Sequence, residues 1–213
     1  KLTTKEIVSI SGVSSAVIAA AARIGILNEE IIPRDSPYPV LNPNFKSKKL
    51  SSSQINACKA IKDDQKTNSF SSILLQGVTG SGKTEVYLEA VANALKNGEQ
   101  VLVLLPEIAL TSEFFNRVKN RFGANPAEWH SGATLAERRR IWKMVASGGA
   151  KLVIGARSAL FLPFMNLGLV IVDEEHDHSY KQEDGVIYNA RDMAVLRSSI
   201  EGITVILASA TPS

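Results

Sequence analysis

Cysteine and long apolar runs are scarce in this 213-residue sequence. Its single cysteine, Cys58, excludes an internal disulfide and could not hold zinc alone. No apolar run reaches the roughly 20 residues that a membrane-spanning helix needs, so no membrane partner is expected. No charged segment followed by an apolar one opens the chain, and we therefore expect no leader and a cytoplasmic location. Because Lys1 stands where a methionine would begin a protein, an excised fragment is expected.

Composition allows one compact α/β domain with a small appendage. The 45% share of hydrophobic residues is sufficient for a sizeable core, whereas the length is too short for two full domains. Charge is unevenly distributed: residues 113–151 carry eight basic and three acidic side chains, and residues 173–184 carry six acidic and one basic. The acidic stretch could hold a cation or form a solvated loop, and composition alone leaves both open.

Residues 1–34 are predicted to form a winged-helix-like appendage. Two short helices meet at residues 11–14, where Ser14 can cap the second helix, and short strands are expected at 26–27 and 31–32. The second helix of such a motif often reads DNA, but this one is small and apolar nearly all round. We therefore expect this second helix to pack within the protein, and DNA binding is the alternative. Four prolines between residues 33 and 43 predict a linker over 35–50.

Residues 51–213 alternate helical and strand patterns. Apolar strands separated by amphipathic helices predict a parallel sheet covered on both faces. Helices are expected near 52–67, 83–96, 110–122, 134–147 and 190–199, and strands near 73–76, 101–105, 127–129, 151–155, 169–172 and 203–208.

The strongest motif lies between the first strand and the helix after it. Residues 77–84 match the pattern G-x-x-x-x-G-K-[ST], in which backbone N–H groups surround phosphate oxygens. Lysine then reaches the β and γ phosphates, and the threonine hydroxyl can bind Mg²⁺. The predicted ATP-binding residues here are Gly77, Val78, Thr79, Gly80, Ser81, Gly82, Lys83 and Thr84.

A second motif comes directly after the buried strand 169–172. It begins with Asp173 and Glu174. A carboxylate at the carboxyl end of a strand, facing the phosphate loop, can hold Mg²⁺, and its neighbour can orient and deprotonate a water. We therefore predict Lys83, Asp173 and Glu174 as catalytic residues, Thr84 and Asp173 as the magnesium ligands, and ATP with Mg²⁺ as the cofactors.

These motifs, with His176 and the Ser-Ala-Thr segment 209–211, resemble the motor core of superfamily 2 helicases. The resemblance implies that residues 51–213 form a RecA-like, ATP-binding phosphate-loop motor lobe of the α/β class. Four segments match one helicase family more specifically: 105–111, 130–139, 154–161 and 173–182. Over the whole chain, the sequence is similar to the primosomal protein N′ family of replication restart helicases. That family implies an ATP-driven 3′ to 5′ DNA helicase that acts in replication restart and primosome assembly. Its expected partners are forked or single-stranded DNA, primosome proteins and single-strand-binding protein.

The resemblance also implies roles for individual residues. Gln54 would hydrogen-bond adenine. Coupling of hydrolysis to movement would involve His176, Ser209, Ala210 and Thr211. The residues expected near DNA are Pro106, Thr111, His130, Arg157, Tyr180, Lys181, Tyr188 and Arg191. Tyr180 and the three residues named after it lie in a segment, 178–192, that resembles the family's aromatic-rich loop, which can sense single strands by stacking.

Departures from the family pattern limit these expectations. Ala156 and Val186 stand where threonine and tryptophan are usual, so DNA sensing is expected to be weaker or differently distributed. The zinc-binding insert and the second motor lobe, which supplies an arginine to the ATP site, are absent from the sequence, so we expect the fragment to bind ATP with little turnover. Another superfamily 2 translocase, an RNA helicase and a non-hydrolysing nucleotide sensor are the alternatives.

Overall fold

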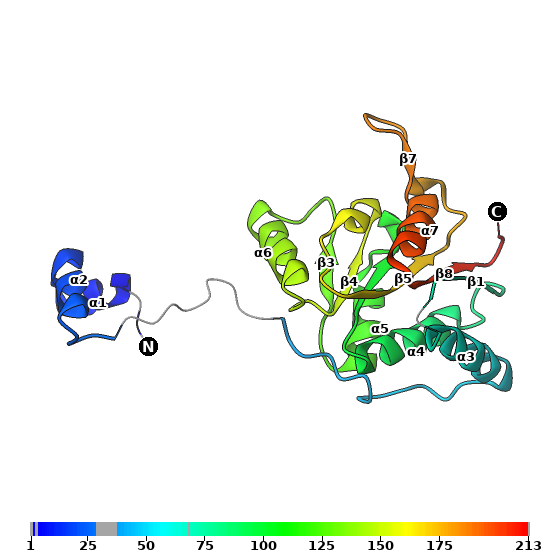
Figure 1. Ribbon diagram of the computed structural model, residues 1–213, viewed down its shortest axis with the longest axis horizontal. Coiled ribbons are helices and arrows are strands. Elements are labelled where there is room, and N and C mark those ends of the chain that lie inside the picture. Colours follow the sequence, from blue (N-terminus) through cyan, green and yellow to red (C-terminus); the bar gives the residue numbers. More distant parts are fainter. Residues whose placement is uncertain (1, 3, 29–37, 68, 213) are drawn as a thin grey trace. The chain divides into compact units, whose positions relative to one another are not determined.

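The computed structural model describes residues 2, 4–28, 38–67 and 69–212 (Figure 1). The chain divides into two compact units, Lys1–Ser36 and Pro37–Ser213, called here the small unit and the main unit. Among the described residues no single helix has the length and apolar composition to cross a membrane. Only helices α1 and α2 taken together, as a pair bent by 115°, reach that length and composition.

The small unit contains α1 (Thr4–Ser11) and α2 (Ser15–Arg23). Ser14 occupies the N-cap position of α2, as predicted, although its side chain makes no capping hydrogen bond. The expected strand at 26–27 is wrong: the N–H groups of Ile26 and Leu27 both bond to the Ala21 carbonyl, 3.0 and 3.3 Å away, and so close the end of α2. Its expected partner, 31–32, lies outside the described residues.

A six-stranded parallel sheet in the order β1-β8-β5-β2-β4-β3 forms the centre of the main unit. These strands are β1 (Ser71–Gln76), β2 (Gln100–Leu104), β3 (Ala127–Trp129), β4 (Leu152–Gly155), β5 (Leu167–Asp173) and β8 (Thr204–Ser209). Residues 100–104 of β2 are all buried, and so is most of β5, as expected for strands covered on both faces. The predicted parallel α/β sheet is confirmed.

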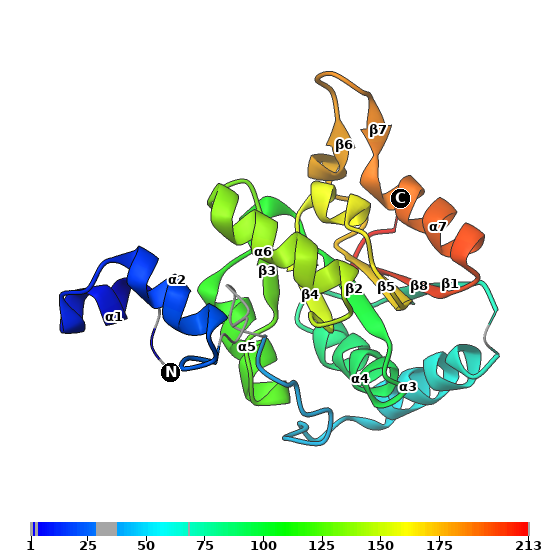
Figure 2. The same ribbon diagram turned by 60° about the vertical axis from the view of Figure 1, so that its left-hand side comes forward.

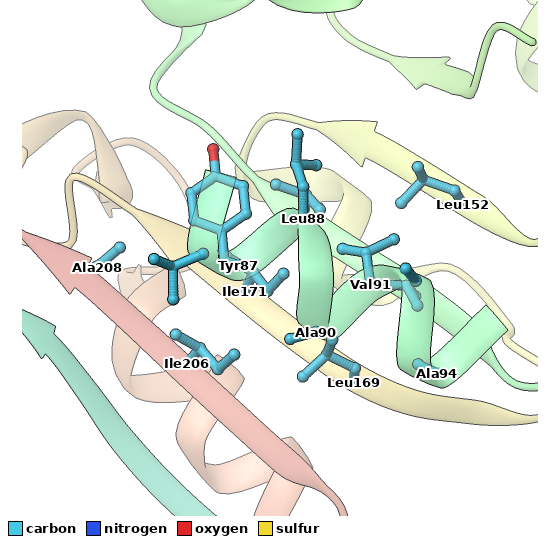
Figure 3. Close-up of a cluster of buried hydrophobic side chains, with 14 of the residues drawn as sticks. Tyr87, Leu88, Ala90, Val91, Ala94, Leu152, Leu169, Ile171, Ile206 and Ala208 are labelled. Carbon is cyan, nitrogen blue, oxygen red and sulfur yellow. The ribbon is translucent and has the colours of Figure 1, made fainter. Parts of the chain in front are cut away.

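Helices cover both faces of this sheet (Figures 1 and 2). Side chains alternate between faces, so Val101 and Val103 pack under α3 (Ser52–Gln65), α4 (Lys83–Lys96) and α5 (Ser112–Phe122). Leu102 and Leu104 face α6 (Leu135–Ala146) and α7 (Ala190–Glu201) on the other side. Figure 3 shows the apolar face of α4 against β5 and β8.

Local sequence signals explain where the helices begin and end. Ser51 and Gln54 form a capping box on α3, and Thr134 and Glu137 form another on α6. Glycine comes directly after α5 and α7 in the left-handed region, where other residues are strained. The helix predicted for 110–122 begins at Ser112, after the 3₁₀ turn η1 (Glu107–Ala109).

Residues 38–50, the described part of the linker predicted for 35–50, pack on the rest of the main unit, and residues 35–37 lie outside the described residues. The Asn42 N–H donates to the Phe122 carbonyl at 2.9 Å, and Arg121 Nη1 donates to the Pro43 carbonyl at 2.9 Å. Lys48 Nζ lies 2.6 Å from Glu85 Oε1 on α4. Proline removes N–H donors from this stretch but leaves its carbonyls and side chains free to bond.

A short hairpin was not predicted. Strands β6 (Lys181–Gln182) and β7 (Tyr188–Asn189) pair antiparallel and stand out from the main unit (Figure 2). Two further 3₁₀ turns lie beyond the ends of central strands, η2 (Arg157–Phe161) after β4 and η3 (His178–Tyr180) after β5. These elements are too short to produce a periodic pattern in the sequence.

Candidate functional site

The predicted chemical groups lie at the carboxyl ends of neighbouring parallel strands. The phosphate loop comes after β1, the Asp173 motif ends β5, and the Ser209 segment ends β8 between them. The register pairs Gln76 with Ser209 and Asp173 with Ala208. Because parallel strands end at one edge of the sheet, segments distant in sequence meet there, as in ligand crevices of α/β domains.

The phosphate loop has the backbone that a phosphate site requires. Gly82 caps α4 with a φ of 83°, a left-handed conformation that favours glycine. Lys83 begins the helix, and its Nζ donates to the Gly77 carbonyl at 2.8 Å across the loop. The Gly77 N–H donates to Ser209 O at 3.1 Å, which anchors the loop to β8. The first N–H groups of α4 and their positive dipole end thus face the loop, where an anion is stabilised.

Gln54 contacts the phosphate loop directly. Its Oε1 accepts the Ser51 N–H at 2.8 Å, and its Nε2 donates to the Ser81 carbonyl at 2.8 Å. The contact with adenine that the resemblance implies stays a prediction. The geometry adds a link between the start of α3 and the phosphate loop.

Asp173 is the carboxylate best placed to hold a cation near this loop. Its Oδ1 accepts the Glu174 N–H at 3.0 Å, and its Oδ2 accepts the Tyr87 hydroxyl at 2.8 Å. Burial raises the pKa of Asp173, while the hydrogen bond from Tyr87 opposes that rise. Thr84, the other expected magnesium ligand, lies one turn before Tyr87 on the same helix. A buried carboxylate and a hydroxyl are oxygen donors of the kind Mg²⁺ takes.

Glu174 and His176 lie beside this carboxylate. Glu174 has a φ of 46°, and it is the one non-glycine residue with positive φ in the described part of the chain. Such a conformation costs free energy and turns the chain sharply at the strand end. Its Oε2 lies 3.7 Å from His176 Nδ1, which also lies 2.8 Å from Ser209 Oγ. Ser209 Oγ in turn accepts the Thr211 N–H at 3.1 Å.

His176, Ser209 and Thr211 therefore form one connected chain with Glu174, as their expected coupling role requires. Ala210, between Ser209 and Thr211, belongs to the same short segment after β8. The coupling itself stays a prediction.

Tyr180 requires a correction. It was expected to stack on DNA, but its side chain is 1% exposed. Its hydroxyl lies 2.6 Å from the Asp173 carbonyl and 3.0 Å from the Leu104 carbonyl, and the two carbonyls share its single proton, which ties the ends of β5 and β2 together. Burial raises the pKa of Tyr180 well above its usual value, so the hydroxyl stays a neutral donor. In this conformation the ring is a core residue and is unavailable for stacking.

The other loop residues form the base of the β6–β7 hairpin. Arg157 Nη1 donates to the Lys181 carbonyl at 2.7 Å, and Lys181 Nζ lies 3.0 Å from Glu183. Arg191 Nη1 lies 3.1 Å from Oε2 of the buried Glu175. The Tyr188 ring meets Phe161 edge-on, with centroids 5.2 Å apart. The Arg191 contact joins the start of α7, directly after the hairpin, to the residue after Glu174.

The remaining expected DNA-facing residues lie on the β2 and β3 side of the sheet. Pro106 is buried after β2, and Thr111 caps α5 by accepting the Phe114 N–H at 3.3 Å. His130 lies just after β3 and lines a groove of about 470 Å³ together with Lys119 and other residues of α5. DNA binding there stays a prediction.

The sequence assigned neither Tyr87 nor Glu175 a role in this site. Residues 84 and 87 lie on the same side of a helix, and this spacing is the one signal that places Tyr87 near a phosphate-loop threonine. The spacing does not show where the Tyr87 hydroxyl is directed.

The comparisons with known proteins agree with this geometry. Residues 51–213, more than half of the chain, match the family described as DEAD/DEAH box helicase. The chain belongs to this helicase family. Its main unit is therefore a helicase motor lobe.

Individual relatives are more specific. This helicase chain is 45% identical over 199 residues to replication restart protein PriA of Rickettsia conorii, and 39% identical over 215 residues to PriA of Bacillus subtilis. The alignments cover 90% and 100% of this chain. They cover only 30% and 27% of those proteins, so the chain spans less than a third of the curated relatives' length.

Solved helicase structures share the fold. RecG bound to a three-way DNA junction has a TM-score of 0.58 and 27% identity, over 78% of this chain and 22% of that one. MrfA bound to DNA and AMPPNP has a TM-score of 0.55 and 20% identity, over 94% of this chain and 26% of that one. At that identity MrfA supports the fold of the helicase lobe alone.

Proposed function

We propose that this chain is the ATP-binding lobe of a cytoplasmic, ATP-dependent 3′ to 5′ DNA helicase that acts in replication restart and primosome assembly. One observation carries the ATP-binding part: the phosphate loop, Asp173 and Glu174 meet at one sheet edge, connected through Ser209 and His176. The similarity to PriA proteins supports the replication role, with forked or single-stranded DNA, primosome proteins and single-strand-binding protein as partners. Zinc belongs to parts of the complete protein outside this chain.

Each group in the site has a task in this proposal. Lys83 and the N–H groups at the start of α4 hold the phosphates, and Thr84 with Asp173 holds Mg²⁺. When bound, the magnesium ion neutralises phosphate charge. Glu174 orients the attacking water and accepts its proton, while the contact between His176 and Ser209 transmits the state of the site to β8.

Nucleotide binding is tested by removing the Lys83 charge. Lys83→Ala should weaken ATP and ADP binding by about 10-fold or more, because a charge-assisted hydrogen bond contributes about 1.5–3 kcal/mol. Lys96→Ala is the matched control, since Lys96 is the last residue of the same helix and is exposed. Calorimetric titration that gives equal affinities for all three proteins would contradict the proposal.

The nucleic-acid substrate is tested on the complete protein. DNA should stimulate ATP hydrolysis more than RNA of the same sequence, and a tailed duplex should be unwound only with a 3′ single-stranded tail. Stimulation by RNA alone would favour an RNA helicase with the same lobe. Nucleotide binding with no hydrolysis under any condition would favour a sensor, against the presence of Glu174.

A further inference from the structure

Tyr87 places a polar atom at the edge of an apolar cluster. Its side chain is 0% exposed and packs among residues of α4, β5 and β8. Figure 3 shows the phenol oxygen pointing away from labelled side chains of β5 and β8 such as Leu169 and Ile206. A buried hydroxyl is costly unless it is hydrogen-bonded, so its partners indicate what it does.

Its hydrogen-bond partner is one of the two side chains expected to bind magnesium. The hydroxyl donates to Asp173 Oδ2 at 2.8 Å, across 86 positions of sequence. Thr84, the other expected magnesium ligand, lies one turn earlier on the same helix. Burial and the charge of Asp173 raise the pKa of Tyr87 well above its usual value. The phenol therefore remains a neutral donor.

The Asp173 carboxylate is held from two sides. Its Oδ1 is bonded to the Glu174 N–H, so the Tyr87 hydroxyl sets the direction of the other oxygen. A charged oxygen accepts more than one hydrogen bond, so Oδ2 keeps a lone pair that can face the ion or a water of its shell. Partners of this kind orient metal-binding carboxylates and typically change metal affinity 10- to 100-fold.

We infer that Tyr87 is a positioning residue for the magnesium site, holding the Asp173 carboxylate in the orientation that receives Mg²⁺ with the nucleotide. The inference rests on the proposed function, because it requires a magnesium-dependent nucleotide site. Tyr87 itself touches neither phosphate nor water in this role. It acts through Asp173.

The test compares nucleotide affinity with and without magnesium. ADP and the non-hydrolysable analogue AMPPNP are titrated calorimetrically into the wild-type chain and Tyr87→Phe, in Mg²⁺ and in EDTA. Tyr87→Phe keeps the ring and its packing, and should lose roughly 10-fold or more of the affinity gained from Mg²⁺ while its affinity in EDTA is unchanged. Tyr38→Phe is the matched control, because Tyr38 is half-buried over Arg140. It should behave as wild type.

Each other outcome overturns the inference. Equal losses in Mg²⁺ and EDTA would mean a general structural role. Equal affinities of Tyr87→Phe and wild type in both media would remove the positioning role while the magnesium-dependent binding of the wild type still supports the proposed function. No nucleotide binding by the wild type would defeat both.

Two further measurements test whether Tyr87 acts on the magnesium site through Asp173. In an Asp173→Ala background, Tyr87→Phe should cause no additional loss of magnesium dependence, and an undiminished loss would show that Tyr87 does not act through Asp173. If Tyr87→Phe unfolds at the assay temperature, 3-fluorotyrosine at position 87 replaces it. Its ¹⁹F resonance should shift when Mg²⁺ is added to the ADP complex, and an unchanged resonance would overturn the inference.

Discussion

Truncating Tyr180 separates two interpretations of the segment after Asp173. If the ring stacks on DNA, as the sequence suggests, it is exposed and its loss costs little stability. In the structure it is 1% exposed, and its hydroxyl joins the carbonyls of Asp173 and Leu104 at the ends of two central strands. Tyr180→Phe and Tyr180→Ala should therefore both destabilise the protein, in two distinct steps.

The size of each step depends on the interactions that are lost. Tyr180→Phe removes the one buried donor that the two carbonyls share, which costs about 1–2 kcal/mol. Tyr180→Ala also removes a buried ring, for which large-to-small substitutions cost about 3–5 kcal/mol. In a chain of this size each kcal/mol lowers the melting temperature by about 2–4 °C. The alanine variant should then melt roughly 10 °C or more below the wild type.

Urea unfolding monitored by circular dichroism measures both steps, with thermal melts alongside. Tyr188→Ala is the matched control, because Tyr188 is only partly buried and meets one ring, Phe161, edge-on. It should cost less than about 1.5 kcal/mol. Equal and small losses in Tyr180→Ala and Tyr188→Ala would refute the buried position of Tyr180 and restore the stacking interpretation.

Two more predictions concern turnover and pH. The isolated chain should bind nucleotide but release phosphate very slowly, with or without single-stranded DNA. The reason is that an arginine finger from another lobe contributes about 10³- to 10⁵-fold in the rate of phosphoryl transfer. DNA-stimulated turnover close to that of the complete protein would show that one lobe suffices. Hydrogen bonds from Ser179, first from its side chain and then from its N–H, which lies 2.7 Å from Asp177 Oδ1, lower the pKa of Asp177 below its usual 3.8. The ionised Asp177 carboxylate stabilises the folded protein above that pH, and this stabilisation is lost as pH falls through the lower folded-state pKa. The difference in unfolding free energy between wild type and Asp177→Ala, measured by urea unfolding, should therefore be constant near neutral pH and shrink below about pH 3.8. A gap that widens in acid would contradict this assignment.

The sequence by itself determined the sheet class and the position of the phosphate loop. Both depend on short-range rules: apolar periodicity identifies buried strands and amphipathic helices, and a glycine such as Gly82, with a φ of 83°, is needed where the backbone turns left-handed. The strand predicted at 26–27 shows the limit of such rules, because two apolar residues also satisfy the closing turn of a helix. The roles of Asp173 and Glu174 were predicted because both carboxylates come directly after a buried strand.

Only the tertiary structure decided which side chains meet. The strand order places β8 between β1 and β5, and this is why Ser209 contacts both the phosphate loop and His176. Tyr87 and Tyr180 are both tyrosines next to polar motifs, and nothing in their local sequence shows where either hydroxyl is directed. Each donates to Asp173, one to the carboxylate and one to the backbone carbonyl, from positions 86 and 7 residues away. Hydrogen bonds of this kind depend on how strand ends are packed together, which local periodicity does not encode.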